Sequence, residues 1–338
     1  IFAINELPDL APRIQVALLN ILEERDLQIR GFPVRIPMDI MLVFSANPED
    51  YTSRGNIITP LKDRIDSQVL THYPRDVATA RRITEQESWV ERDDQTIELP
   101  EMVRDLVEKI AFGARESELV DQSSGVSARM PISAIELLMS NLERRGARSG
   151  DTVLYPRLSD FLMLVPAITG KVEMVYEGEQ QGAEVVAQSL IGSAIRELFE
   201  SIFPAIDRSG SRERRRRMAD DEDVDSMFRR VNSREEPADE EDADSVWEEV
   251  LSWFAEGNSI MVSDELPFEQ YQRELSKVKG LEEIVLAHAT PAGPGEKAFL
   301  MELALEGLHQ SLRLAREDID STITFSELAK FNVLRTVR

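Results

Sequence analysis

The chain has 338 residues, 42% of them hydrophobic, which is enough for two or three domains with cores of their own. A formal net charge of -24 argues against indiscriminate binding to phosphate backbones, and the lack of cysteine excludes disulfides and thiolate metal sites. No apolar run approaches the roughly 20 residues that cross a bilayer and no signal peptide is visible, so we expect a cytoplasmic protein without membrane contact.

The first third of the chain alternates strand and helix patterns. Residues 1–4 are apolar on consecutive positions, which is typical of a strand buried on both faces, and Asn5 and Glu6 follow directly. Apolar residues then recur at helical spacing from Pro12 onwards. Alternating apolar residues on both sides of "RGFP" predict a β-hairpin over residues 27–36.

A second apolar strand, "DIMLVFSAN", again ends on a polar residue, Asn47. A loop, a short helix near residues 61–65 and a third short strand at 68–72 follow. This rhythm predicts a parallel sheet of the α/β class. We expect the strands near residues 1–5 and 40–46 to be adjacent and parallel, and the strand at 68–72 to be displaced from them.

From residue 75 the pattern becomes helical. The expected helices cover residues 76–90, 100–115, 127–145, 157–169 and 183–203. Residues 207–245 are densely charged and almost free of large apolar side chains, which predicts a disordered linker. Acidic blocks that directly follow "RERRRR" favour a solvated segment over a nucleic-acid patch. Residues 246–338 are expected to form a small helical C-terminal domain.

Three polar side chains point to chemistry at one edge of the predicted sheet. Open α/β sheets place their sites at the carboxyl ends of the strands, where Glu6 and Asn47 lie, and Arg64 follows on the next short helix. A carboxylate can polarise a water, an amide can orient it, and a guanidinium can neutralise charge developing on a phosphate. The plainer alternative makes the first two residues strand caps and pairs Arg64 with Asp63 or Asp66. The three histidines are far apart in sequence, so no metal site built from histidine is expected.

The ordered motifs "IFAINELPDL", "QVALLNILEERDLQIRG", "MLVFSANPEDY" and "PLKDRI" resemble the second half of an AAA+ ATPase module. The resemblance is to the magnesium chelatase ATPase subunit and MoxR-type proteins. It implies that Glu6 is the catalytic glutamate at the end of the Walker B strand, Asn47 the sensor-1 residue and Arg64 the arginine finger. "SGVSARMPISAIELL" is similar to the start of the sensor-2 helix, which implies a nucleotide-binding role for Arg129. A plain alternative pairs Arg129 with Glu136.

The resemblance also implies an architecture. Residues 1–75 would be the C-terminal half of an AAA+ P-loop NTPase core with a parallel sheet, and residues 76–206 an all-α lid with its following helix. The charged linker at 207–245 and the helical domain at 246–338 would complete the chain. In the family's strand order 5-1-4-3-2, this sequence would supply strands 3, 4 and 5.

Two departures from the family pattern bear on activity. Walker B normally ends in Asp-Glu, whereas this chain has Asn5-Glu6, so Asn5 would hold Mg²⁺ through water with an oxygen but without a charge. The phosphate-binding motif G-x-x-x-x-G-K-[ST] does not occur in the sequence, although the family places it upstream of Walker B. We therefore expect a fragment that lacks its nucleotide cradle and does not hydrolyse ATP alone.

The resemblance implies ATP and Mg²⁺ as cofactors and a homo-oligomeric ring, a hexamer, with ATP bound between subunits. Hydrolysis would be coupled to remodelling of a partner protein or to metal or cofactor insertion, with a von Willebrand A-domain protein as a partner. The alternative is a nucleotide-dependent scaffold with a degenerate Walker B that assembles without turnover. A transcriptional activator of the same superfamily ranks lower, because no helix-turn-helix and no strongly basic domain are visible, so no specific nucleic-acid partner is expected.

Overall fold

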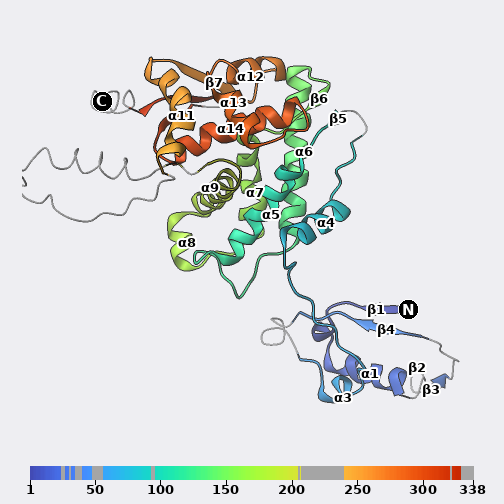
Figure 1. Ribbon diagram of the computed structural model, residues 1–338. Helices are drawn as coiled ribbons and strands as arrows, with labels where there is room; N and C mark the ends of the chain where they lie inside the picture. Colours follow the sequence, from blue (N-terminus) through green and yellow to red (C-terminus); the bar gives the residue numbers. More distant parts are fainter. Residues whose placement is uncertain are drawn as a thin grey trace, which may run out of the picture. The chain divides into compact units, whose positions relative to one another are not determined.

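The computed structural model describes residues 1–23, 27–29, 32–34, 40–47, 56–92, 96–204, 206, 240–319 and 322–328. The chain forms two compact units, Ile1–His72 and Tyr73–Arg338 (Figure 1). Each unit has its own hydrophobic core, so each is described by itself. Among the described residues, no helix is both long enough and apolar enough to cross a bilayer.

The first unit is built on two parallel strands, β1 (Phe2–Ile4) and β4 (Leu42–Phe44). Phe2 pairs with Leu42 and Ile4 with Phe44, which confirms the expected pairing. The expected third strand at residues 68–72 is wrong, because this segment has no regular structure. Its apolar side chains Val69 and Leu70 are 86% and 74% exposed, so burial does not hold the segment against a neighbouring strand.

Helices cover one side of this strand pair. They are the 3-10 turn η1 (Leu7–Asp9), helix α1 (Pro12–Glu23) and helix α3 (Thr59–Lys62). Strands β2 (Leu27–Ile29) and β3 (Phe32–Val34) form the expected antiparallel hairpin. The core gathers around Leu7, Leu18 and Leu61. The expectation that the strands are buried on both faces is wrong for the described residues. Val43 is 43% exposed and its partner Ala3 is exposed as well, whereas Ile4 and Phe44 on the other face pack against the core.

The second unit begins with helices at the expected places, except that residues 157–169 form a 3-10 stretch followed by a short α-helix and that the helix Tyr176–Gln181 was not expected. They are α4 (Val77–Glu87), α5 (Glu101–Glu116), α6 (Arg129–Ser149), η2 (Leu158–Leu164), α7 (Val165–Thr169), α8 (Tyr176–Gln181) and α9 (Ala183–Ile202). Local chemistry sets their ends: the Asp76 carboxylate accepts a hydrogen bond of 2.7 Å from the Thr79 amide at the start of α4. Gly150 ends α6 in the left-handed conformation. Strands β5 (Thr96–Ile97) and β6 (Val153–Leu154) form a short parallel pair.

The C-terminal part is not all-helical, and this corrects the expected helical C-terminal domain. Its described residues form four helices and a three-stranded antiparallel sheet of order β7-β9-β8. The elements are α11 (Glu240–Ala255), β7 (Ser259–Ser263), α12 (Phe268–Leu275), α13 (Leu281–His288), α14 (Pro294–Gln310), β8 (Leu314–Ile319) and β9 (Thr322–Glu327). Every second residue of β7 and β9 is buried, namely Ile260, Val262, Ile323 and Phe325. This period of two is the signature of a half-buried strand.

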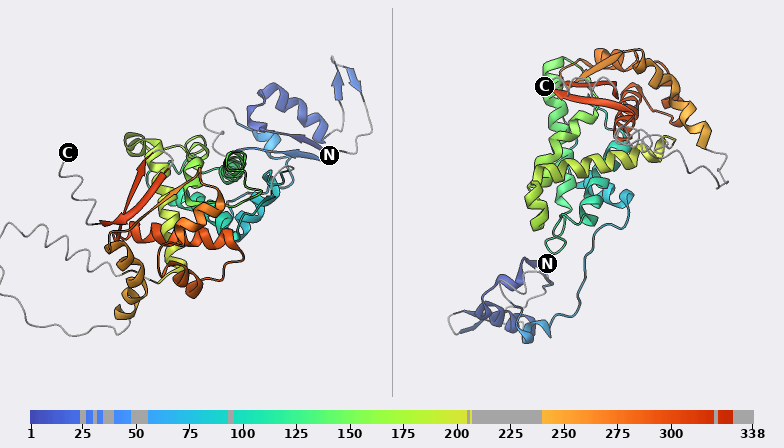
Figure 2. Two further views of the ribbon diagram at one scale, coloured as in Figure 1. Left: turned by 90° about the horizontal axis from the view of Figure 1, so that it is seen from above. Right: turned by 90° about the vertical axis from the view of Figure 1, so that its left-hand side faces the viewer.

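The expected linker largely falls outside the structure. Residues 207–239 lie outside the described residues, whereas residues 240–245 belong to helix α11. The helices before and after this segment share one hydrophobic core, and α14 packs against α9, α12, α13 and β8 (Figure 2). Residues 298–301 of α14 are all fully buried, so this helix is the centre of the second unit. Packing therefore joins the expected lid and the expected C-terminal domain in one body.

Candidate functional site

The carboxyl ends of β1 and β4 are joined by a set of hydrogen bonds around Ser45. The Ser45 amide donates to the Ile4 carbonyl at 3.0 Å, and the Leu7 amide donates to the Ser45 carbonyl at 2.9 Å. The Glu6 amide donates to Ser45 Oγ at 3.1 Å, and Ser45 Oγ lies 3.4 Å from Asn5 Oδ1. Ser45 thus holds the residues after one strand against the end of the other. Sequence reasoning did not single it out, although it lies in the same "FSAN" segment as Asn47.

Glu6 has a strained backbone at this strand end. Its φ and ψ angles of 52° and 57° lie in the left-handed region, which costs a non-glycine residue about 1–2 kcal/mol. Such strain persists where surrounding contacts enforce it and is common at functional sites. The Glu6 side chain is exposed and does not cap the η1 turn that it precedes. Its carboxylate is therefore available to water or a ligand.

Asn47 lies at the same edge of the strand pair. It is the third residue after β4 and is exposed, and β4 is parallel to β1 in direct register. Asn5, Glu6 and Asn47 therefore follow the carboxyl ends of two neighbouring parallel strands. One carboxylate and two amides supply oxygen ligands but only one negative charge. This set suits a hydrated Mg²⁺ that takes its remaining ligands from phosphate oxygens.

Arg64 lies just beyond α3 and is held by the neighbouring helix α1. Its Nε and Nη2 atoms lie 2.9 Å and 2.8 Å from Glu23 Oε2, and Nη1 donates to the Pro60 carbonyl at 2.9 Å. The ion pair therefore involves Glu23 rather than the neighbouring Asp63 or Asp66. Both side chains are partly exposed, at 32% for Arg64 and 58% for Glu23.

A buried glutamine fixes the segment that leads to Arg64. Gln15 of α1 is fully buried, and its Nε2 donates to the carbonyls of Leu10 at 2.9 Å and Asn56 at 3.1 Å. Its Oε1 accepts from the Ile58 amide at 2.9 Å. The amide side chain thus satisfies three backbone groups and ties the start of α3 to α1. Gln15 was not recognised from the sequence, because its partners are backbone atoms of distant loops.

Arg129 belongs to the second unit, whereas the other candidate residues belong to the first. It is the first residue of α6 and is exposed. Within the part of the chain that the structure describes, its side chain makes no hydrogen bond or ion pair. The alternative pairing with Glu136 is not formed, because Glu136 Oε1 accepts from the Trp89 amide at 3.2 Å. The guanidinium is therefore exposed to solvent at a helix start.

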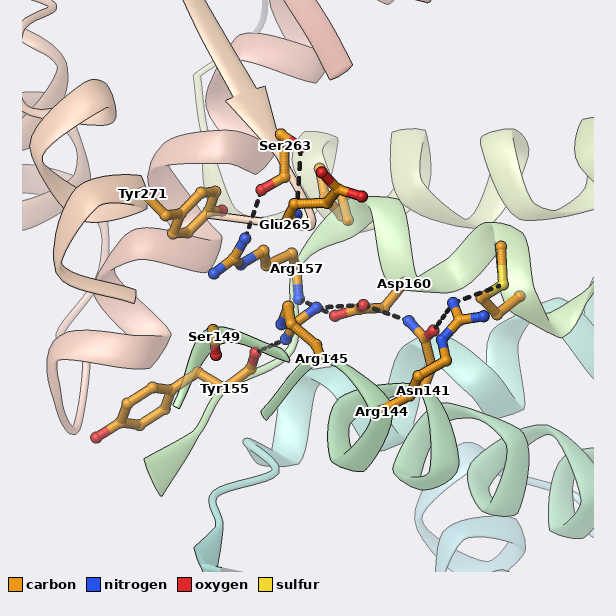
Figure 3. A network of polar contacts seen from close by, with 12 residues as sticks. Asn141, Arg144, Arg145, Ser149, Tyr155, Arg157, Asp160, Ser263, Glu265 and Tyr271 are labelled. Carbon is orange, nitrogen blue, oxygen red and sulfur yellow. Dashed lines mark hydrogen bonds and ion pairs between the residues drawn. The ribbon is translucent and has the colours of Figure 1, made fainter. Parts of the chain in front are cut away.

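A second polar cluster lies in the interior of the second unit (Figure 3). The Asp160 carboxylate accepts from Asn141 Nδ2 at 2.6 Å, from the Arg157 amide at 2.7 Å and from Arg145 Nη1. Arg145 also donates to the Tyr155 carbonyl. The bonds from Asn141 and Arg145 connect α6 to Asp160 of η2 and to the preceding loop, and the bond from the Arg157 amide caps the start of η2. They fix the loop between the two helices.

Arg157 extends this cluster to the C-terminal part of the chain. It is 2% exposed, and its Nη1 and Nη2 atoms donate to the carbonyls of Ser263 at 2.6 Å and Leu266 at 2.7 Å. The guanidinium also lies 4.2 Å above the ring of Tyr271 (Figure 3). Burial lowers the pKa of Arg157, and Arg145 adds to this effect. Arg157 thus bridges two segments that lie more than a hundred positions apart.

Glu302 of α14 completes the cluster. Its Oε2 accepts from the Tyr271 hydroxyl at 2.6 Å and from the Leu158 amide at 2.9 Å. Burial raises the pKa of Glu302, and these two hydrogen bonds oppose the shift. Two arginines and two carboxylates balance each other's charge within the cluster. The side chains of this cluster join helices to one another, so we assign the cluster a structural role.

Comparison with models of known protein families gives no match, and comparison with curated proteins gives none either. The function is therefore inferred from the residues of the strand edge and from their resemblance to known motifs. That edge combines a strained, exposed carboxylate with amides from two parallel strands. The polar cluster of the second unit, by contrast, is enclosed.

The Tyr271–Glu302 hydrogen bond is expected to contribute to stability. A Tyr271→Phe variant leaves a buried carboxylate short of one donor, so we expect the free energy of unfolding to fall by about 1–3 kcal/mol. Tyr176 is 69% exposed and its hydroxyl accepts from Gln180, so the matched Tyr176→Phe control should change stability by less than about 0.5 kcal/mol. Urea unfolding measures both. Equal effects of the two changes would contradict a special role for the buried hydroxyl.

The loss of stability caused by Tyr271→Phe also depends on pH. The Tyr271 hydroxyl lowers the pKa of Glu302, so its loss raises the folded-state pKa further. A carboxyl whose pKa is raised on folding stabilises the protein at low pH, and this contribution is lost as the pH rises through the folded-state pKa. The destabilisation by Tyr271→Phe should therefore be larger at about pH 8 than at about pH 4. A constant difference would show that Glu302 does not titrate in this range.

Proposed function

We propose that the chain is part of an AAA+ ring ATPase of the magnesium chelatase and MoxR type. The observation that supports the proposal best is the parallel pairing of β1 with β4, which puts Glu6 and Asn47 after neighbouring strand ends. The left-handed backbone of Glu6 adds a strained carboxylate at the position where the resemblance places the catalytic glutamate. In this proposal, hydrolysis drives the remodelling of a partner protein or the insertion of a metal or cofactor.

Each residue of the edge has a chemical role in this proposal. Bound ATP would supply the reacting γ-phosphoryl group and Mg²⁺ would neutralise part of its charge. The Glu6 carboxylate accepts a hydrogen bond from the attacking water and polarises it, and the Asn47 amide orients that water. Asn5 offers an amide oxygen to the hydration shell of the cation, with Ser45 holding its side chain. The resemblance also gives Arg129 a role in nucleotide binding.

Arg64 would act on the nucleotide of a neighbouring subunit. To do so its guanidinium must leave Glu23, and the partial exposure of this ion pair makes that step inexpensive. Exposed ion pairs contribute at most about 1 kcal/mol, whereas an arginine finger accelerates phosphoryl transfer by about 10³ to 10⁵. We propose that Glu23 binds the Arg64 guanidinium between turnovers. The ring would be a homo-oligomer, a hexamer, with a von Willebrand A-domain protein as its partner.

A non-hydrolysing scaffold is the second candidate. It is favoured by Asn5 in place of the usual aspartate, since an amide gives the cation an oxygen without a charge. In this case nucleotide binding would drive assembly without turnover. The C-terminal part of the chain, residues 246–338, would then supply the interaction surface.

A Glu6→Gln variant of the intact protein, including any chain that precedes Ile1, should bind ATP normally and lose turnover. The amide keeps the shape of the side chain but does not polarise water as a carboxylate does, so a loss of about 10² to 10⁴ in rate is expected. Phosphate release and nucleotide binding measure the two effects. Asp9→Asn, an exposed change three positions further on, is the matched control and should leave turnover unchanged. Parallel loss of binding and turnover would argue for a structural role of Glu6.

An Asn5→Asp variant separates the two candidate functions. It restores the charge that a Walker B strand normally offers to Mg²⁺, so the concentration of Mg²⁺ needed for half-maximal hydrolysis should fall. If the wild-type protein is a scaffold that does not hydrolyse ATP, hydrolysis should be seen only in the Asn5→Asp variant. If the wild-type protein hydrolyses ATP and the variant does not change its Mg²⁺ dependence, the site works as it stands with asparagine.

The finger role of Arg64 predicts complementation between two inactive variants. Mixed rings of Arg64→Ala and Glu6→Gln subunits contain some interfaces with both an intact arginine and an intact glutamate, so they should recover part of the ATPase activity. The matched control is Glu23→Ala, which removes the same ion pair from the other side and should leave hydrolysis near the wild-type rate.

Three results would contradict this assignment. The first is near-wild-type hydrolysis by Arg64→Ala rings. The second is an equal loss of activity in Arg64→Ala and Glu23→Ala, which would show that the ion pair, rather than the arginine itself, is needed. The third is a mixture of Arg64→Ala and Glu6→Gln subunits that stays inactive, which would contradict the role of Arg64 in the active site of a neighbouring subunit.

A further inference from the structure

The second unit contains a cavity of about 230 Å³ that is separate from the strand edge. Its wall comes from α4, α5, α6 and the segment that follows α4. The volume is below the roughly 300–1,000 Å³ of pockets for drug-sized ligands, so a smaller molecule would fill it. Two polar lining residues, Thr84 and Glu108, and three apolar ones, Val90, Leu99 and Ile135, determine what this cavity can bind.

Glu108 brings a carboxylate into the wall of this cavity. The residue is 2% exposed, and its Oε1 accepts a hydrogen bond from Thr84 Oγ1 at 2.5 Å. Among the described residues, Oε2 has no hydrogen-bond partner and Glu108 makes no ion pair. Burial raises the pKa of Glu108, while the Thr84 hydroxyl and the charge of Arg115 oppose the shift. Oε2 is not among the enclosed atoms that lack a partner, so a donor or cation that enters the cavity can reach it and pair with it.

The positive charges on the cavity wall are already engaged by other carboxylates. Arg81 pairs with Glu101 and Asp105, and Arg104 pairs with Glu85 at 2.7 Å. The Thr84 hydroxyl is used by Glu108, and the Ser88 hydroxyl donates to the Thr84 carbonyl at 2.6 Å. What the wall still lacks is therefore a partner for the carboxylate of Glu108. An anionic ligand would be repelled by this carboxylate, because the arginines of the wall are already paired with other carboxylates.

The rest of the lining favours an apolar body on the ligand. Val90, Leu99 and Ile135 present hydrocarbon to the same cavity. We propose that this cavity is a binding site for a small organic ammonium compound, whose charged nitrogen pairs with Glu108 and whose apolar body packs on Val90, Leu99 and Ile135. This site is independent of the proposed ATPase function.

Binding of phenethylammonium to the full chain tests the proposal by isothermal titration calorimetry. Phenethyl alcohol and phenylacetate have similar bodies without the positive charge. We expect the ammonium compound to bind at least about 10-fold more tightly than the alcohol, since hydrogen bonds to charged groups are the stronger kind, and phenylacetate to bind most weakly. Equal affinities for the three compounds, or no saturable binding of the ammonium compound, would overturn the proposal.

Two variants locate the site. Glu108→Gln keeps the shape of the side chain and removes its charge, so it should weaken phenethylammonium binding about 10-fold to 100-fold. Glu87→Gln makes the same change at an exposed position on α4 and should leave the affinity unchanged. Thermal unfolding establishes that both variants are folded. Binding that is unaffected by Glu108→Gln would overturn the proposal.

Val90→Phe provides a test that does not depend on Glu108. The larger side chain fills part of the cavity, so phenethylammonium affinity should fall at least about 10-fold while the charge of the wall stays the same. This variant decides the matter if Glu108→Gln fails to fold. Unchanged affinity in a folded Val90→Phe protein would place the ligand elsewhere and contradict the assignment.

Discussion

The proposed site depends on the parallel backbone pairing of β1 and β4. Because the strands run in the same direction, the residues that follow them, Glu6 and Asn47, come to one edge. Ser45, which directly follows β4, strengthens this arrangement by bonding to the backbone of Ile4, Glu6 and Leu7 at the end of β1. An antiparallel pairing would put these two side chains at opposite ends of the strands. The chemistry proposed for this edge therefore begins with the direction of two three-residue strands.

A different constraint organises the second unit. Arg157 donates to the loop after β7, and Glu302 of α14 accepts from the start of η2. Both side chains are buried, and each is paired with groups far away in the sequence. Polar groups in such a place need all their partners, so they allow few alternative packings. This cluster and the shared hydrophobic core explain why residues on both sides of the charged segment fold as one body.

Periodicity in the sequence predicted the local elements better than their assembly. The helices of the second unit and the hairpin at 27–36 follow from spacings that a single segment contains. The sheet of β7, β8 and β9 was missed because "SIMVS" and "TITFSE" are short alternating runs beside long helical patterns. Gln15 and Arg157 were missed for another reason: both bond to backbone groups of distant segments, which no local pattern reveals. Glu6, Asn47 and Arg64 were proposed from motif order rather than from contacts, and their roles stay predictions.

The most direct test of the account is a structure of the intact protein carrying Glu6→Gln, determined with ATP and Mg²⁺. The account predicts a γ-phosphate beside position 6 and Asn47, with the cation near Asn5. It also predicts that Arg64 of the adjacent subunit has left Glu23 and contacts the same phosphate. A nucleotide bound elsewhere, or a ring in which Arg64 stays paired with Glu23 next to bound ATP, would contradict the account.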